Sequence, residues 1–176
     1  MCLMPGTILY ATSFLPAADS SARISRQRQS PAARNLLELL KAGIASSVSS
    51  RSHSRAAIAA AVGDSEILNL GIDIECMDPE RPFVALAGFL VEDAPSDIDA
   101  ETFYRCWTFA EAYFKAFQRA PSDRAVRTVS TLENSGKTAR LDDGTQLLHR
   151  RVADRFQLCL VWQAAGDACA LRYVEA

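Results

Sequence analysis

Apolar residues recur every three to four positions in two segments of the chain, which predicts two long helices. The first covers residues 31–42 (PAARNLLELLKA), with Pro31 near its start and Gly43 after its end. The second covers residues 101–118 (ETFYRCWTFAEAYFKAFQ) and has the more regular pattern. One narrow side of this second helix is predicted to lie in the core: Phe103, Cys106, Trp107, Ala110, Phe114 and Phe117. The adjoining side carries Tyr104, Thr108, Glu111 and Lys115.

Shorter apolar runs predict strands. Residues 6–14 (GTILYATSF) are expected to form the first one. Residues 56–64 (AAIAAAVGD) fit a helix or a strand, and we favour a strand, because Gly63-Asp64 leads directly into the apolar stretch 65–75 (SEILNLGIDIE). The two runs are therefore expected to form a hairpin.

The remaining segments predict loops and a second group of strands. A polar, serine-rich loop is expected at 46–55, a turn at 77–82, a short helix at 83–90 and an acidic connection at 91–101. From about 126 to 175, short alternating runs with turn signals at Asp143-Gly144 and Gly166-Asp167 predict an antiparallel meander. Together these elements predict an α+β fold in a single domain over residues 1–176.

Within the stretch 69–78 (NLGIDIECMD), two charged residues lie inside the apolar run of a predicted buried strand. Leu70, Ile72 and Ile74 are typical of a core strand, yet Asp73 and Glu75 share its other face, since side chains two apart point the same way. Buried carboxylates need a cation or hydrogen-bond donors.

The predicted 101–118 helix supplies a third carboxylate, Glu111, and a neighbouring Lys115. A Glu-Lys pair at this spacing is ordinarily a surface ion pair of low energy. Added to Asp73 and Glu75, it makes a plausible site for a hard cation such as Mg²⁺, which prefers carboxylate oxygens and substrate phosphate. An alternative is that internal arginines, for example Arg81 or Arg105, satisfy the strand carboxylates.

Composition narrows the classes of partner. The 176 residues carry a formal net charge of −2, which argues against a nucleic-acid-binding protein. The five cysteines form no CxxC pair, so free thiols in a reducing cytosol are expected. The first residues lack a basic segment followed by a long apolar one, and no stretch is apolar enough to span a bilayer. We therefore expect a cytoplasmic protein without a membrane or nucleic-acid partner.

Three ordered blocks of residues carry a resemblance. GIDIE at 71–75 is followed by a second block that consists of Phe103, Trp107, Thr108, Glu111, Ala112 and Lys115, and it is preceded by RSHSRAAIAAAV at 51–62. The stretch GFLVEDAP at 88–95 lies between GIDIE and the block that begins at Phe103. This arrangement resembles the paired signature of the 4′-phosphopantetheinyl transferase superfamily.

The resemblance implies a Mg²⁺-dependent enzyme that transfers phosphopantetheine from coenzyme A to a serine of an apo acyl or peptidyl carrier protein. It implies antiparallel sheets with packed helices in two pseudo-twofold halves, about 1–65 and 66–176, in a monomer or small homo-oligomer. It assigns Asp73, Glu75 and Glu111 to the metal, Lys115 to phosphate, and Glu111, or a water it holds, to the role of base. It assigns His53, with Ser52 beside it, to the 3′-phosphate of coenzyme A, and basic residues upstream, among them Arg26 and Arg28, to the same group.

The chain departs from the family pattern in ways that support an alternative. Ala110 replaces the usual lysine before the glutamate of the second block, and no glycine follows Lys115 in KAFQRAPSD. The alternative is a non-catalytic relative that binds a carrier protein, a nucleotide or another partner. The second histidine, His149, has no support from the pattern and is predicted to be structural or on the surface.

Overall fold

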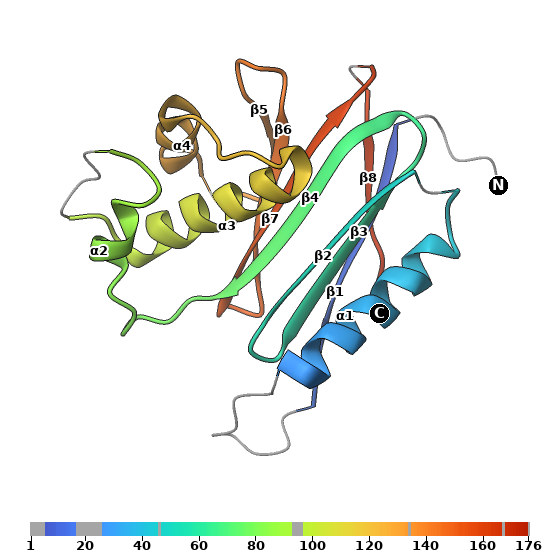
Figure 1. Ribbon diagram of the computed structural model, residues 1–176, viewed down its shortest axis with the longest axis horizontal. Helices are drawn as coiled ribbons and strands as arrows, with labels where there is room; N and C mark the ends of the chain where they lie inside the picture. Colours follow the sequence, from blue (N-terminus) through green and yellow to red (C-terminus); the bar gives the residue numbers. More distant parts are fainter. Residues whose placement is uncertain are drawn as a thin grey trace.

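The computed structural model describes residues 6–16, 26–45, 47–92, 97–133, 135–166 and 168–175, and in these ranges it shows two sheets and four helices (Figure 1). The elements in chain order are β1 (Thr7–Phe14), α1 (Arg26–Lys41), β2 (Val48–Ser54), β3 (Ala57–Gly63), β4 (Ile67–Cys76), α2 (Phe83–Ala87), α3 (Ala100–Phe117), α4 (Asp123–Ser130), β5 (Thr138–Arg140), β6 (Gln146–Val152), β7 (Phe156–Ala164) and β8 (Ala170–Tyr173). The class is α+β with mostly antiparallel sheets, as the sequence predicts.

The first sheet has the strand order β2-β3-β1-β8. Its centre is the alanine-rich β3, which is buried along its whole length and pairs antiparallel with β1 and β2. Small side chains leave room for α1, and Leu36, Leu37 and Leu40 of that helix pack on Ile58 and Val62. The first sheet is thus covered on its outer face by α1 (Figure 1).

The second sheet has the order β4-β7-β6-β5, and all its pairs are antiparallel. Its outer face packs against α3 and α4 through Phe109 and Tyr113 of α3, Val126 and Val129 of α4, and Val161 of β7. Its inner face meets the first sheet in the largest apolar cluster of the described residues. The layers are therefore helix, sheet, sheet and helices (Figure 1).

Close packing of α3 on β4 depends on Gly71. A Cβ atom added to this glycine would lie 1.9 Å from the carbonyl oxygen of Ala112 and 2.9 Å from the amide nitrogen of Ala116. The backbone of α3 therefore occupies the space that any side chain at position 71 would need. This contact brings the outer face of β4 against the helix.

Several predicted elements are confirmed. The strands at 6–14 and 56–64, the turn at 77–82, the short helix within 83–90 and the helix at 101–118 occur within a few residues of the predicted bounds. The turn at Asp143-Gly144 is also present, with Gly144 at φ 82°. Residues 93–96 of the acidic connection and Asp167 lie outside the described residues.

The prediction of a loop at 46–55 is wrong, because Val48–Ser54 form the edge strand β2. Its residues alternate between exposed positions, such as Ser49 and Arg51, and less exposed serines that bond to β4. An edge strand whose two faces are both polar has no apolar alternation, which is why the pattern indicates a loop.

The predicted hairpin of β3 and β4 is also wrong. Both edges of β3 are already occupied by β1 and β2, so the chain turns at Asp64 and β4 enters the second sheet beside β7. The first long helix begins at Arg26 and not near Pro31, which lies inside it. A proline inside a helix has no backbone N–H, so the hydrogen bond to the carbonyl group one turn earlier is missing.

Two parts of the predicted meander differ in the structure. Residues 123–130 form α4, which begins at the capping side chain of Ser122 and buries Val126 and Val129. The spacing of these two valines is helical, although β-branched residues favour strands. β8 leaves the second sheet and pairs parallel with β1 in the first. Only β5, β6 and β7 form the predicted meander.

The predicted core side of the 101–118 helix is largely wrong. Phe103 and Cys106 are buried, but Phe114 is 51% exposed, and Trp107 and Ala110 are only half-buried. The buried side instead carries Phe103, Tyr104, Arg105, Cys106, Thr108, Phe109, Ala112 and Tyr113. Apolar residues lie on both sides of this helix, and the side that contains the small Ala112 approaches the sheet at Gly71.

Within the described residues, no helix combines the length and the apolar character that crossing a bilayer requires.

Candidate functional site

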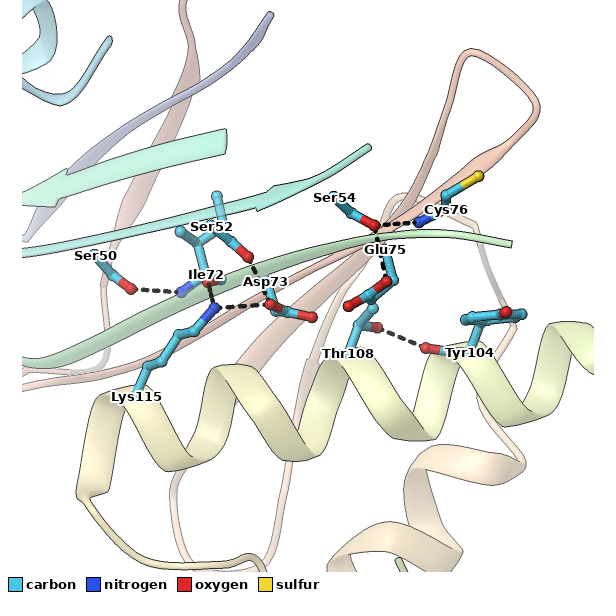
Figure 2. Close-up of polar contacts among 10 residues, drawn as sticks. All are labelled: Ser50, Ser52, Ser54, Ile72, Asp73, Glu75, Cys76, Tyr104, Thr108 and Lys115. Atoms are coloured by element: carbon cyan, nitrogen blue, oxygen red, sulfur yellow. Dashed lines mark hydrogen bonds and ion pairs between the residues drawn. The ribbon is translucent and has the colours of Figure 1, made fainter. Parts of the chain in front are cut away.

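The candidate site lies where β4 passes between β2 and α3 (Figure 2). Side chains of β4 alternate, so Ile72 and Ile74 enter the inner core while Asp73 and Glu75 project from the other face, which packs on α3. Figure 2 shows both carboxylates in the space between strand and helix. Groups from β2 and α3 stabilise these charges.

Asp73 has unequal oxygens. The residue is 4% exposed, and its Oδ1 accepts hydrogen bonds from Ser52 Oγ and Lys115 Nζ, each at 2.7 Å. Its Oδ2 is buried and accepts no hydrogen bond from any described residue. A buried carboxylate oxygen without a donor is costly, so Oδ2 is available to a ligand such as a cation.

Lys115 reaches from α3 to β4. Its Nζ donates to Asp73 Oδ1 and, at 3.1 Å, to the carbonyl oxygen of Ile72. An ammonium group has three donors, so one N–H is left for another acceptor. Lys115 therefore neutralises Asp73 and still has capacity to bind an anion.

Glu75 is half-buried, and its Oε2 accepts a hydrogen bond from Ser54 Oγ at 2.8 Å. Burial raises the pKa of Glu75 above its ordinary value, and the charge of Asp73 raises it further. The hydrogen bond from Ser54 and the charges of Arg81 and Lys115 lower it. Two carboxylates on one strand face thus repel each other and favour a shared cation.

Glu111 is exposed on α3. Partial burial of its carboxyl group raises its pKa, the charge of Asp73 raises it further, and Lys115 lowers it. Asp73 is therefore close enough to influence both glutamates. The described residues nevertheless contain no group of three or more His, Cys, Asp or Glu side chains already arranged to hold a metal ion.

The residues present are suitable for binding Mg²⁺. The observation that supports this is Oδ2 of Asp73, which has no partner among the described residues. Mg²⁺ is commonly bound through one or two protein carboxylates, while waters and phosphate complete its octahedron. Asp73 offers the free oxygen, and its charge raises the pKa of both Glu75 and Glu111. A complete set of protein ligands is not required for such a site.

The internal arginines considered as partners of the strand carboxylates have other contacts. The guanidinium of Arg81 lies 5.7 Å from the ring centre of Tyr104 and 6.0 Å from that of Trp107, and its charge only lowers the pKa of Glu75. Arg105 donates to Thr102 Oγ1 and to the carbonyl oxygen of Ser130. The cation on Asp73 is Lys115 instead.

Of the residues predicted for the 3′-phosphate of coenzyme A, Ser52 lies in the carboxylate site, whereas His53 and Arg28 lie on the α1 side of the first sheet. His53 alternates with Ser52 on β2 and pairs with Ile58, whose side chain packs under α1, so it lies on the α1 side of the first sheet. Arg28 is exposed on α1. The backbone of Arg26 begins this helix, but its side chain is outside the described part of the structure. Ser52 points to the other face of β2 and donates a hydrogen bond to Asp73.

His149 is buried, which excludes the surface alternative predicted for it and leaves the structural one. It is 2% exposed, and its Nε2 lies 3.1 Å from the carbonyl oxygen of Arg105. Burial lowers the pKa of His149 to about 3, and the charge of Arg105 contributes. The ring is neutral at ordinary pH and joins β6 to α3.

The structure adds contacts that the sequence analysis does not include. Ser50, Ser52 and Ser54 all bond to β4, through the amide of Ile72, the carboxylate of Asp73 and the carboxylate of Glu75, respectively. Serines at three alternate positions lie on the same face if the segment is a strand. This spacing could have indicated a row of hydroxyl groups.

A cavity of about 270 Å³ lies elsewhere, between α2, α3 and α4. Its walls include Leu90, Ile98, Thr102, Cys106 and Val126, and none of the predicted site residues lines it. Thr102 and Cys106 lie on a different side of α3 from Glu111 and Lys115. The cavity is thus separate from the carboxylate site.

No protein-family model matches the chain, and no curated protein matches it. The resemblance to the phosphopantetheinyl transferases therefore depends on the motifs of the sequence, and the interpretation of the site depends on its geometry.

Proposed function

We propose that the protein is a Mg²⁺-dependent 4′-phosphopantetheinyl transferase that uses coenzyme A and modifies a serine of an apo acyl or peptidyl carrier protein. The observation that carries the proposal is the buried Oδ2 of Asp73, which accepts no hydrogen bond from the described residues, in a site that also contains Glu75, Glu111 and Lys115. A carboxylate-rich site with one lysine suits a cation and a diphosphate together.

We also propose a phosphopantetheinyl transferase-like fold with two related halves, about 1–65 and 66–176. Two four-stranded sheets, each packed against a long helix, support it, and β8 of the second half completes the sheet of the first. In this interpretation the site lies at the junction of the halves, since β2 belongs to the first sheet and β4 to the second. We also place the protein in the cytoplasm, where coenzyme A and carrier proteins meet.

In the proposed reaction, the serine oxygen of the carrier protein forms a bond to the phosphorus next to pantetheine, and the bond from that phosphorus to 3′,5′-ADP breaks. Asp73, with Glu75 and Glu111, would hold Mg²⁺, which neutralises charge on the diphosphate. The free N–H of Lys115 would donate to a phosphate oxygen.

Glu111 is the proposed base. Within the described residues its carboxylate has no ion pair or hydrogen bond, and it is exposed, so it can reach an incoming hydroxyl. Its raised pKa makes it a better proton acceptor than an ordinary glutamate. It would take the proton of the serine as the new bond forms. His53 and Arg28 would bind the 3′-phosphate of coenzyme A from the α1 side of the first sheet.

One observation favours the second candidate, a non-catalytic relative that binds a carrier protein or a nucleotide. Lys115 already neutralises Asp73 within the protein, and position 110, where the family has a lysine, is alanine. A protein that no longer handles the diphosphate could keep the site closed in this way.

The test is the intact mass of an apo acyl carrier protein after incubation with the protein, coenzyme A and Mg²⁺. We expect the mass to rise by one phosphopantetheine group, and to stay unchanged without Mg²⁺ or with Glu111→Ala. Glu101→Ala is the matched control, because Glu101 is a carboxylate of the same helix that pairs with Arg151 away from the site. Absence of the increment across carrier proteins of fatty-acid, polyketide and peptide synthesis would favour the non-catalytic relative.

A further inference from the structure

The two sheets meet along a seam made of side chains. β2 and β4 are edge strands of different sheets, and in the described residues no backbone ladder joins them. Serine hydroxyls of β2 bond to β4 at three successive alternate positions, Ser50, Ser52 and Ser54 (Figure 2). Groups of the first sheet thus determine how the polar side chains of β4 are held.

Ser54 differs from the other two because its hydroxyl makes two bonds to the same strand. Its Oγ accepts the amide N–H of Cys76 at 3.1 Å and donates to Glu75 Oε2 at 2.8 Å. The N–H occupies a lone pair, so the single hydroxyl hydrogen is directed at the carboxylate. The Glu75 carboxylate is thereby tied to the backbone of its own strand, one residue further along.

We infer that Ser54 is a positioning residue for Glu75, which it holds in place for a divalent cation. Its bond occupies Oε2, and within the described residues Oε1 accepts no hydrogen bond, so Oε1 is the oxygen left for the ion. Partners that orient a metal ligand through its second atom commonly affect metal affinity strongly. This inference rests on the proposed function, since it concerns the same metal site.

A comparison with Ser50 can distinguish an effect of Ser54 on Glu75 from a general loosening of the contact between β2 and β4. Ser50 accepts the amide N–H of Ile72 at 3.0 Å and has no described bond to a carboxylate, so it joins the two strands without touching the site. Ser50→Ala therefore disturbs the seam alone. Ser54→Thr keeps the hydroxyl, and Ser54→Cys keeps an acceptor for the Cys76 amide but donates only weakly to Glu75.

The experiment is a titration of the full chain with Mn²⁺, a spectroscopic substitute for Mg²⁺ at oxygen ligands, followed by electron paramagnetic resonance. We expect Ser54→Ala and Ser54→Cys to weaken Mn²⁺ binding about 10-fold or more, while Ser54→Thr and Ser50→Ala stay within about twofold of wild type. Thermal unfolding of each variant shows which of them are folded. If Ser54→Ala does not fold, Ser54→Cys alone tests the loss of the bond to Glu75.

The outcomes distinguish the inference from the proposed function. Wild-type affinity in both Ser54→Ala and Ser54→Cys would overturn the role of Ser54 and leave the proposed function intact. An equal loss in Ser50→Ala would also overturn it, because the effect would then come from the seam. If the wild-type protein binds no Mn²⁺, with or without coenzyme A, the metal site itself is wrong and both proposals fail.

Discussion

Asp73 shows how a single residue can be both satisfied and incomplete. Its Oδ1 has a hydroxyl and an ammonium donor, which offset the cost of burying the charge, whereas its Oδ2 has no donor. A residue kept only for stability would gain from a donor on both oxygens, or from replacement by an apolar side chain. The asymmetry leaves one carboxylate oxygen for the cation that we propose.

His149 gives a prediction for the pH dependence of stability. Its pKa is lowered by burial to about 3 in the folded protein, whereas the unfolded chain takes up a proton near pH 6.5. Above that pH the group has no effect, and as the pH falls from about 6.5 toward 3 the unfolded state binds the proton first. Stability should therefore be lost by about 1.4 kcal/mol per pH unit in this window.

The measurement is the free energy of unfolding in urea at pH 6.5 and pH 5 for wild type and His149→Gln, which keeps an N–H for the carbonyl of Arg105. We expect wild type to lose about 2 kcal/mol more than the variant. Contributions of Glu75 and Glu111 are common to both proteins and cancel in this difference. Equal losses would mean that His149 can be protonated in the folded protein.

At the scale of elements, the contact between α3 and β4 determines the geometry of the site. Lys115 can reach Asp73, and the charge of Asp73 can act on Glu111, because the helix lies directly on the strand at Gly71. A longer distance between the two elements would separate the lysine from the carboxylate. The position of one glycine and one alanine thus decides whether residues from two motifs form a common site.

We predict that Gly71→Ala destabilises the protein by about 3 kcal/mol or more, because the new Cβ would lie 1.9 Å from the backbone oxygen of Ala112 and α3 would have to move. Gly88→Ala is the matched control, because its nearest contact would be 3.8 Å away and its φ of −62° suits alanine. We expect Gly88→Ala to be neutral or to stabilise by up to about 1 kcal/mol. Chemical denaturation measures both, and similar losses would contradict this account of the packing.

Elements with strong apolar patterns were predictable from the sequence. β1, β3 and α3 have such patterns and lie within a few residues of their predicted bounds. β2 is polar on both faces, so its strand character comes from its pairing with β3 and its bonds to β4, which are not local. The buried side of α3 depends on which side fits the sheet, and both sides of the helix contain apolar residues.

The candidate site was predictable in its residue types but not in its contacts. Motif spacing indicates Asp73, Glu75, Glu111 and Lys115, and the structure brings Lys115 onto Asp73. The bond from Ser54 to Glu75 depends on the approach of two edge strands from different sheets, and no short-range pattern specifies that approach.

At the scale of the whole molecule, ligand binding should appear as added stability. If Mg²⁺ and coenzyme A bind the folded protein together, a concentration of 100 times Kd stabilises it by about 2.7 kcal/mol. For a domain of this size that corresponds to a rise of roughly 5–10 °C in Tm. Differential scanning fluorimetry measures this shift with each ligand alone and with both.

Asp73→Asn should abolish the part of the shift that depends on Mg²⁺, because Oδ2 or its replacement no longer carries charge. A shift with coenzyme A that is independent of Mg²⁺ would instead support a nucleotide-binding relative without the metal site. No shift with any combination would contradict the proposed transferase.

The pairing of β8 with β1 has a consequence for how the protein is made. Thr7–Tyr10 leave the ribosome early, but their parallel neighbour Ala170–Tyr173 is synthesised more than 150 residues later. Until then the backbone N–H and C=O groups on this edge of β1 have no strand to pair with. Other nascent chains on the same messenger RNA can pair with them instead. The first sheet therefore closes only after translation has passed Tyr173, and a chaperone that shields β1 during elongation would raise the yield of folded protein.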